Sequence, residues 1–412
     1  MGHKSIFQTI GFFLGPIIAL IILLSTPPEG LSVNAWKTVA LGSWMAIWWG
    51  SEAIPIPVTS LLPLIFLPLV GVSGLRDAAA PYASPIIFLL LGGFIIAMAM
   101  QRWNLHQRIA LTILNMFGNR PTAIIGGFMA ATALLSMWVS NTATTLMMIP
   151  IALSVGEAIV GPDDKRNPFI LALLLGIAYS ASIGGMGTIV GTPPNVMMVG
   201  YLSETLNINI SFTQWMAFGV PVVLVLTPMA WLVLTKISFK INDHESYAGG
   251  MVVDNELAKM GTISAPERRV AIIFLIIAFA WVFRPWLDNF AIFQNLSDTG
   301  IAIMGAVLMF MVPSGSKVEK NKALLDWEWA VRIPWGVLLL FGGGLSLAAA
   351  VSSTGLAVWM GEGLSVLTTF HLLLLMLAII TMIVFFNRAN QQHCHHSNAF
   401  TCFRCNRHYW RH

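Results

Sequence analysis

Six hydroxyl or carboxamide side chains crowd into an apolar segment, "LLSMWVSNTATTLMMIPIAL" at 134–153: Ser136, Ser140, Asn141, Thr142, Thr144 and Thr145. Such groups are costly in lipid unless they are paired, so they indicate a cavity or a binding site. Their oxygens suit a small cation, and their amide donors suit a carboxylate. Taken alone, the cluster is equally compatible with ordinary hydrogen bonding between helices.

A second unusual segment is "YSASIGGMGTIVGTPPNVMMVGY" at 179–201. Four glycines precede the pair Pro193-Pro194, and such a sequence cannot continue a regular helix. A break frees backbone groups at membrane depth, where carbonyl oxygens suit Na⁺ and helix N-termini suit a carboxylate. A simple kink is the alternative, but the two segments together favour an ion-and-anion site. Neither contains arginine or lysine, so co-bound Na⁺ would have to neutralise an anion.

The elements that position these segments must lie in a bilayer. The chain of 412 residues is 57% hydrophobic and only 10% charged, whereas soluble domains are about 25% charged. Uncharged stretches recur along it, and several approach the roughly 20 residues that a span needs. We therefore predict an all-α polytopic membrane protein, multi-pass in the cell (inner) membrane. The net charge of +4 resides in loops, so no nucleic-acid partner is expected.

Two segments share a pattern of glycines. In 88–110 and 338–361 the pairs Gly92-Gly93 and Gly342-Gly343 are offset by 250 residues, and each apolar arm is about 14 residues long. Interrupted apolar segments at matching places in two halves favour an inverted-repeat transporter with broken helices and two re-entrant hairpins. Two ordinary helices with glycines for close packing are the alternative.

This pattern gives a predicted domain division. It comprises N-terminal scaffold helices at 1–82, a first repeat with hairpin and broken helix at 83–238, a linker at 239–269, an incomplete second repeat at 270–386, and a tail at 387–412. The linker and the loop around 317–332 are basic, so the positive-inside rule predicts that both are cytoplasmic.

The motifs "SNTATT" at 140–145 and "GTPPN" at 191–195 resemble the divalent anion:sodium symporter family, over about residues 5–386. The resemblance implies a secondary transporter of di- or tricarboxylates, of the succinate, malate, fumarate or citrate type, or of sulfate. It also implies Na⁺ as the coupling ion, a homodimer, and an elevator motion of a transport domain against a scaffold. A sodium-independent anion exchanger of the same fold stays open.

The resemblance further implies roles for single residues. Asn141, Thr142, Thr192 and Pro193 would contact the substrate, whereas Ser136, Ser140, Asn141 and the backbone at Gly191 would surround a sodium ion. A membrane enzyme is disfavoured, because the sequence has no H-E-x-x-H motif and no histidine base near the Ser/Thr cluster. The family also needs a second Ser-Asn-Thr and a second Gly-Thr-Pro, and neither is present as written.

The tail is where the second motif is expected. An offset of 250 from Ser140 falls near residue 390, where the sequence is "NRANQQHC". Read one base later, the codons that encode "QQHCHHS" permit "SNTATT". We hypothesise that the tail after about residue 386 is out of frame, so that the chain as written is inactive. The alternative is a genuine metal-binding tail, since it holds Cys394, Cys402, Cys405 and five histidines.

Overall fold

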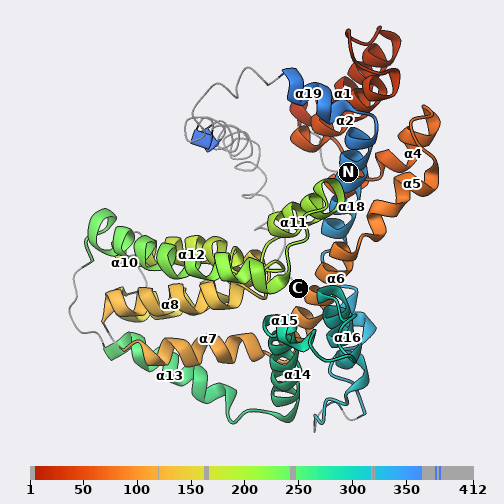
Figure 1. The fold of residues 1–412 in the computed structure, drawn as a ribbon. Helices are drawn as coiled ribbons and strands as arrows, with labels where there is room; N and C mark the ends of the chain where they lie inside the picture. Colours follow the sequence, from red (N-terminus) through yellow and green to blue (C-terminus); the bar gives the residue numbers. More distant parts are fainter. Residues whose placement is uncertain are drawn as a thin grey trace. The chain divides into compact units, whose positions relative to one another are not determined.

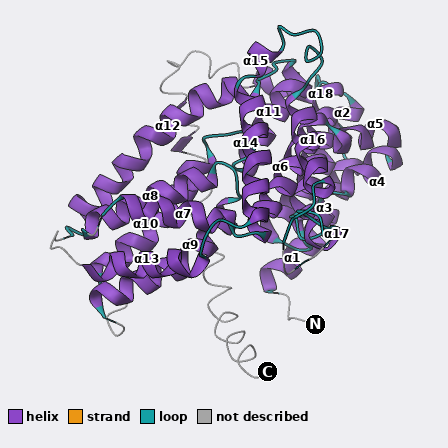
Figure 2. Ribbon diagram, turned by 90° about the horizontal axis from the view of Figure 1, so that it is seen from below, coloured by secondary structure: helices purple, strands orange, loops and turns teal. Residues whose placement is uncertain are grey.

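The computed structural model describes residues 5–118, 120–161, 167–241, 247–316, 319, 321–363, 376–377 and 380–381. Within these ranges the regular elements are helices, and extended chain pairs in a single isolated bridge between Pro313 and Ala323. Figure 2 shows the helices in purple and the loops that connect them in teal. The predicted all-α fold is confirmed. The tail, and with it the reading-frame hypothesis, lies outside the described residues.

The chain divides into two compact units. The first unit takes its described residues from 1–82 and 339–412. Its core is built around Leu41, Met45 and Phe66. Its helices are α1 (Ile6–Leu24), α2 (Val33–Ser51), α3 (Ile56–Thr59), α4 (Leu62–Leu69), α5 (Leu75–Ala79), most of η1 (Ala80–Ala83), most of α18 (Trp335–Ser353) and α19 (Leu356–Gly363).

The second unit spans Ala83–Leu338 and holds both motif segments. Within it α8 packs against both α10 and α12, and Figure 1 shows the three helices side by side. Its helices are α6 (Pro85–Arg102), α7 (Leu105–Met116), α8 (Pro121–Ser136), α9 (Asn141–Val160), α10 (Pro168–Gly185), α11 (Pro193–Leu206), α12 (Phe212–Leu232), the π-helix η2 (Val233–Ser238), α13 (Tyr247–Met260), α14 (Ala265–Val282), α15 (Arg284–Leu287), α16 (Asp298–Met311) and α17 (Trp327–Ala330).

Local sequence explains where the helices of the second unit begin. Ser140 accepts a hydrogen bond from the Ala143 N–H and caps α9, and Asn167 caps α10 through the Phe169 N–H. Ser211 and Gln214 form a capping box on α12. Each cap satisfies a backbone donor that the first helical turn leaves free.

Six described segments are long and apolar enough to cross a membrane: Ile6–Leu24, Leu75–Arg102, Asn141–Val160, Pro168–Gly185, Phe212–Ser238 and Trp335–Ser353. They support a multi-pass membrane protein. Helix α9, one of these spans, carries Asn141 and Thr142 of the predicted site, and the span α10 ends at the break that holds Gly191.

The two glycine pairs lie inside continuous helices. Helix α6 has 18 residues and α18 has 19, both longer than the predicted arms. A Cβ at Gly92 would lie 2.7 Å from the backbone of Ala302, and one at Gly343 would lie 2.3 Å from the carbonyl oxygen of Ser60. The glycines thus allow close helix packing, which was the simpler interpretation. The inverted repeats and re-entrant hairpins stay predictions.

The segment predicted as a linker, 239–269, contains helix α13. Val253 is only 5% exposed and belongs to the core that α7, α8, α9 and α10 share, whereas the Lys259 side chain is 72% exposed. The charged residues of this segment predicted a solvated linker. The structure shows that α13 also has an apolar face, which packs on α7 and α9.

Candidate functional site

The site forms where two breaks in helices meet. Helix α8 ends at Ser136 and α9 begins at Asn141, so residues 137–140 form a turn. Helix α10 ends at Gly185 and α11 begins at Pro193, which leaves 186–192 without helix. The Thr188 hydroxyl, in the second break, donates a hydrogen bond to the carbonyl of Met137 in the first. The motifs "SNTATT" and "GTPPN" are therefore in contact through their flanking turns.

Ser136 and Asn141 are brought together at the first break. The Ser136 hydroxyl is fully buried and lies 2.7 Å from the Asn141 Oδ1 and 2.7 Å from the Ala181 carbonyl oxygen in α10. One hydroxyl hydrogen cannot serve both acceptors fully. Buried oxygen atoms therefore outnumber the donors at this position, which is the chemistry that favours a cation.

Backbone oxygens of both breaks crowd around Gly191. A Cβ at Gly191 would lie 2.6 Å from the Gly185 carbonyl oxygen and 3.0 Å from each carbonyl oxygen of Ser136 and Met137. Gly185 is equally restricted, because its Cβ would lie 2.5 Å from the Asn141 Oδ1. The chain requires glycine at both positions so that these oxygens can approach each other. Together with the Ser136 and Asn141 side chains, they form a cluster of neutral oxygen atoms.

Asn195 holds the second break in shape. Its side-chain Nδ2 donates to the carbonyls of Gly185, at 2.9 Å, and Thr188, at 2.8 Å. The Gly191 N–H in turn donates to the Thr188 hydroxyl at 3.1 Å. Sequence reasoning assigned no role to Thr188 or Asn195, although both lie in the quoted segment and are buried polar residues.

An aromatic cluster anchors the turn at 137–140. Trp138 stacks on Phe212 with ring centroids 6.1 Å apart, Phe212 stacks on Trp281 at 4.5 Å, and Trp138 meets Phe274 edge to face at 5.0 Å. Such pairs add stability beyond their buried area. The sequence analysis also missed this cluster, because its members lie far apart along the chain.

Ser140 and Thr142 face a different space. They line a cavity of about 260 Å³ together with Gln101 of α6 and Arg332, which follows α17. The described contacts link Ser140 to its own helix but not to Ser136 or Asn141. The first motif thus divides: Asn141 turns toward the buried oxygens, and Thr142 toward the cavity.

Thr192 and Pro193 stand at the start of α11, with Thr192 as the N-cap residue. Both are partly exposed. Among the described hydrogen bonds, none joins the Thr192 side chain to Asn141 or Thr142. Thr192 therefore ends the second break and Pro193 begins α11, and no described hydrogen bond joins either residue to the first motif.

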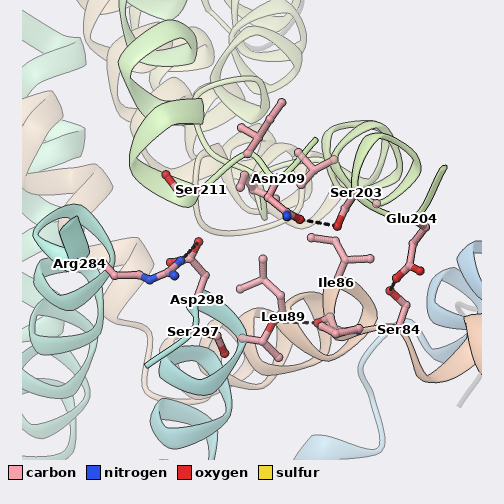
Figure 3. Close-up of a pocket in the computed structure, with 16 residues that line it drawn as sticks. Ser84, Ile86, Leu89, Ser203, Glu204, Asn209, Ser211, Arg284, Ser297 and Asp298 are labelled. Atoms are coloured by element: carbon pink, nitrogen blue, oxygen red, sulfur yellow. Dashed lines mark hydrogen bonds and ion pairs between the residues drawn. The ribbon is translucent and has the colours of Figure 1, made fainter. Parts of the chain in front are cut away.

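A second cavity of the same unit, of about 390 Å³, is chemically different. Figure 3 shows Arg284 directed at Asp298, with 3.1 Å between Arg284 Nη1 and Asp298 Oδ2, and Ser84 donating to Glu204 at 2.8 Å. Two carboxylates and one paired arginine line this cavity, so it is a poorer place for an anion than the cavity at Thr142.

Comparison with known proteins decides the family. The model of the sodium:sulfate symporter transmembrane region matches residues 8–397. The chain belongs to the divalent anion:sodium symporter family. The sodium-dependent dicarboxylate transporter SdcS of Staphylococcus saprophyticus is 42% identical over 386 residues, which cover 92% of this chain and 74% of the relative. The transporter of the same name from Staphylococcus aureus strain USA300 is 41% identical over 365 residues, covering 87% and 70%.

As a member of the symporter family, the chain is a transport protein of the membrane and not an enzyme. This confirms the resemblance drawn from the two motifs. Family membership does not by itself assign a role to any single residue of this symporter.

Proposed function

We propose that this symporter couples the movement of Na⁺ to that of a di- or tricarboxylate. One observation carries the proposal: the two helix breaks meet, with buried neutral oxygens on one side of Asn141 and an open cavity at Thr142 on the other. The names of the relatives, sodium-dependent dicarboxylate transporters, support the same ion and the same class of substrate.

Sodium would bind among the oxygens of Ser136, Asn141 and the backbone around Gly191. The distances of 2.6 to 3.0 Å from a Cβ at Gly191 to three carbonyl oxygens support this position. Half-helix ends and unwound carbonyls are the usual sodium ligands in such transporters. Ser140 would join this set only after its hydroxyl leaves the Ala143 N–H.

The substrate carboxylate would bind at Asn141 and Thr142, with Thr192 and Pro193 on its other side. The start of α9 offers backbone N–H groups and the positive end of a 20-residue helix. No arginine or lysine stands in either motif segment. A dianion would then be held by neutral donors and the adjacent Na⁺, and it could leave when Na⁺ leaves.

We further propose that the protein is a homodimer that works by an elevator motion, as the family resemblance implies. A crosslinking experiment on membranes tests the first part. The dimer proposal predicts a product of twice the chain's mass, and a monomer at all crosslinker concentrations would contradict it.

The reading-frame hypothesis bears on activity. If residues after about 386 are out of frame, the chain as written carries one of two Ser-Asn-Thr motifs and should not transport. The decisive step is to sequence the coding DNA from codon 380 onward. A one-base offset followed by codons for Ser-Asn-Thr would support the hypothesis, whereas an uninterrupted frame would reject it and leave the Cys/His tail to be tested for zinc.

Uptake in proteoliposomes tests the function itself. We expect the frame-restored protein to accumulate labelled succinate under an inward Na⁺ gradient and not under a choline gradient. The chain as written should bind succinate in a sodium-dependent manner without accumulating it. Uptake that needs an internal anion but no Na⁺ would instead assign the exchanger mechanism.

A further inference from the structure

The cavity at Thr142 is lined by a positively charged side chain, to which the proposed sodium and substrate sites assign no role. Arg332, in the turn after α17, lines it together with Gln101, Ser140 and Thr142. The volume of about 260 Å³ lies just below the range for drug-sized ligands, which suits a small anion. Arg332 is therefore a charged group beside the motif that is proposed to hold the substrate.

The charge of Arg332 is not neutralised by a described acidic side chain. Its guanidinium lies 4.3 Å from the ring centre of Trp329, and this cation–π contact leaves the N–H groups at its edge free to donate. Arg102, close by, differs: it forms ion pairs of 2.7 Å with Glu319 and 2.8 Å with Asp326. Among the described residues that line this cavity, Arg332 thus carries the available positive charge.

The backbone fixes where Arg332 stands. Asp326 caps α17 by accepting the Trp329 N–H at 3.1 Å, and the Arg332 N–H donates to the Trp329 carbonyl at 3.1 Å. The stacked ring then limits the rotamers that the guanidinium can adopt. An arginine that is already positioned loses less entropy when it binds an anion.

We propose that Arg332 and Gln101 form an outer anion-binding position at the mouth of this cavity. It holds one carboxylate of the dianion as that group passes between Thr142 and the solution outside the cavity. This inference rests on the proposed function and adds a recruiting and selecting step to it. Because Arg332 is exposed, its attraction is screened by salt, so it can draw in a dianion without trapping it.

Binding of labelled succinate to the purified full chain tests the inference. The variants are Arg332→Gln, Arg332→Lys and, as a control, Arg268→Gln, which removes an exposed arginine in the first turn of α14 that does not line this cavity. At constant Na⁺, choline chloride is varied from about 20 mM to about 300 mM to change screening.

We expect Arg332→Gln to weaken succinate binding by roughly three- to tenfold at low salt, as for the loss of one exposed charge opposite a dianion. The difference should shrink at high salt, and Na⁺ affinity should stay unchanged. Arg332→Lys should recover most of the binding, because it keeps the charge and loses only the planar stacking, and Arg268→Gln should bind normally.

Two results would overturn the inference in different ways. Normal sodium-dependent binding by Arg332→Gln at low salt would reject the outer position and leave the proposed function intact. Equal losses in Arg332→Gln and Arg332→Lys at every salt concentration would assign Arg332 a packing role on Trp329 instead. Absence of sodium-dependent binding in both the unmodified chain and the frame-restored protein would reject the proposed function, and the outer position with it.

Discussion

The Ser136 hydroxyl and the Asn141 carboxamide oxygen lie 2.7 Å apart, across a turn that separates two helices. The same hydroxyl lies 2.7 Å from the Ala181 carbonyl oxygen. Asn141 is also the first residue of α9 and precedes Thr142, which lines the anion cavity. One residue thus connects the oxygens proposed for sodium with the groups proposed for the substrate.

Asn141→Ala should therefore weaken the binding of Na⁺ and succinate together. Loss of a hydrogen bond to a charged group costs about 1.5–3 kcal/mol, which is a roughly 10- to 100-fold loss of affinity. The loss of affinity is measured from sodium-dependent succinate binding by the chain and from succinate uptake by the frame-restored protein. Ser182→Ala is the control, because that hydroxyl bonds to its own helix at Ala178. Unchanged succinate binding with unchanged sodium dependence would reject the shared role.

Gly185→Ala should act on the same oxygen from the opposite side. Its Cβ would lie 2.5 Å from the Asn141 Oδ1, so the carboxamide must move. We expect Na⁺ affinity, measured from the sodium dependence of succinate binding, to fall by about tenfold or more, since real Cβ atoms do not tolerate this contact.

The matched control is Gly50→Ala in α2, another helical glycine, whose Cβ would meet nothing within 4 Å. Alanine should be harmless there and even favour the helix slightly. If Gly185→Ala keeps normal Na⁺ affinity, the Asn141 oxygen does not face the ion.

The residues around Asn141 illustrate how much of the site could be predicted from the sequence. Ser136, Asn141 and Gly191 were noticed because hydroxyl, amide and glycine residues are conspicuous in apolar segments, and their grouping as sodium ligands came from the family resemblance. The structure brings these three together. Gly185 was seen only as part of a helix break, since its contact with Asn141 depends on how α10 packs on α8 and α9. Ser140 was grouped with the sodium ligands, yet its described contact is the cap of α9.

Other features could not be predicted because they join distant positions. Arg332 lies 190 residues after Thr142 in the sequence, and no local pattern relates an arginine in a basic loop to a motif in a span. Trp138, Phe212 and Trp281 each look like ordinary apolar residues. The helices were predictable because span length and low charge follow from the bilayer itself, whereas the glycine pairs of α6 and α18 allowed two interpretations.

A buried ion pair at the start of α14 should make stability depend on pH. Arg108 Nε lies 3.0 Å from Glu267 Oε1, and Ser264 N–H donates to the same carboxylate at 2.6 Å. Burial alone would raise the pKa of Glu267, but the hydrogen bonds from Arg108 and Ser264 outweigh it and lower the pKa below its usual value.

A lowered pKa in the folded state gives stability that is complete above the unfolded pKa and is lost as pH falls through the folded pKa. Glu267→Gln should destabilise the protein at pH 7 by about 3 kcal/mol and remove that acid-dependent loss. Denaturant unfolding in detergent, followed between neutral pH and pH values below about 4.3, measures both effects. Glu256→Gln, on a pair with the exposed Lys259, should cost under about 1 kcal/mol. Equal pH profiles for the unmodified chain and Glu267→Gln would contradict this account.

The pair Arg284–Asp298 gives the last prediction. Asp298 is 9% exposed, and its Oδ2 accepts the Phe212 N–H of α12 at 2.9 Å while lying 3.1 Å from Arg284 Nη1 (Figure 3). Asp298→Asn keeps an acceptor for Phe212 but removes the charge that faces Arg284. We expect a loss of about 2–4 kcal/mol, because the remaining arginine is left partly buried. Asp288→Asn should cost under about 1 kcal/mol, since Asp288 lies 4.0 Å from Arg284 and is more exposed.

A double-mutant cycle separates the contribution of the Arg284–Asp298 ion pair from that of the hydrogen bond between the Phe212 N–H and Asp298. Arg284→Gln alone should leave the Asp298 carboxylate without its cation, yet Arg284→Gln combined with Asp298→Asn removes both charges at once. The double variant should then be more stable than the sum of the two losses predicts, by about 1–3 kcal/mol. Denaturant unfolding of all four proteins in detergent gives this coupling. Strictly additive losses would mean that Asp298 acts only as the acceptor for the Phe212 N–H, and that its ion pair with Arg284 adds nothing to the stability of the fold.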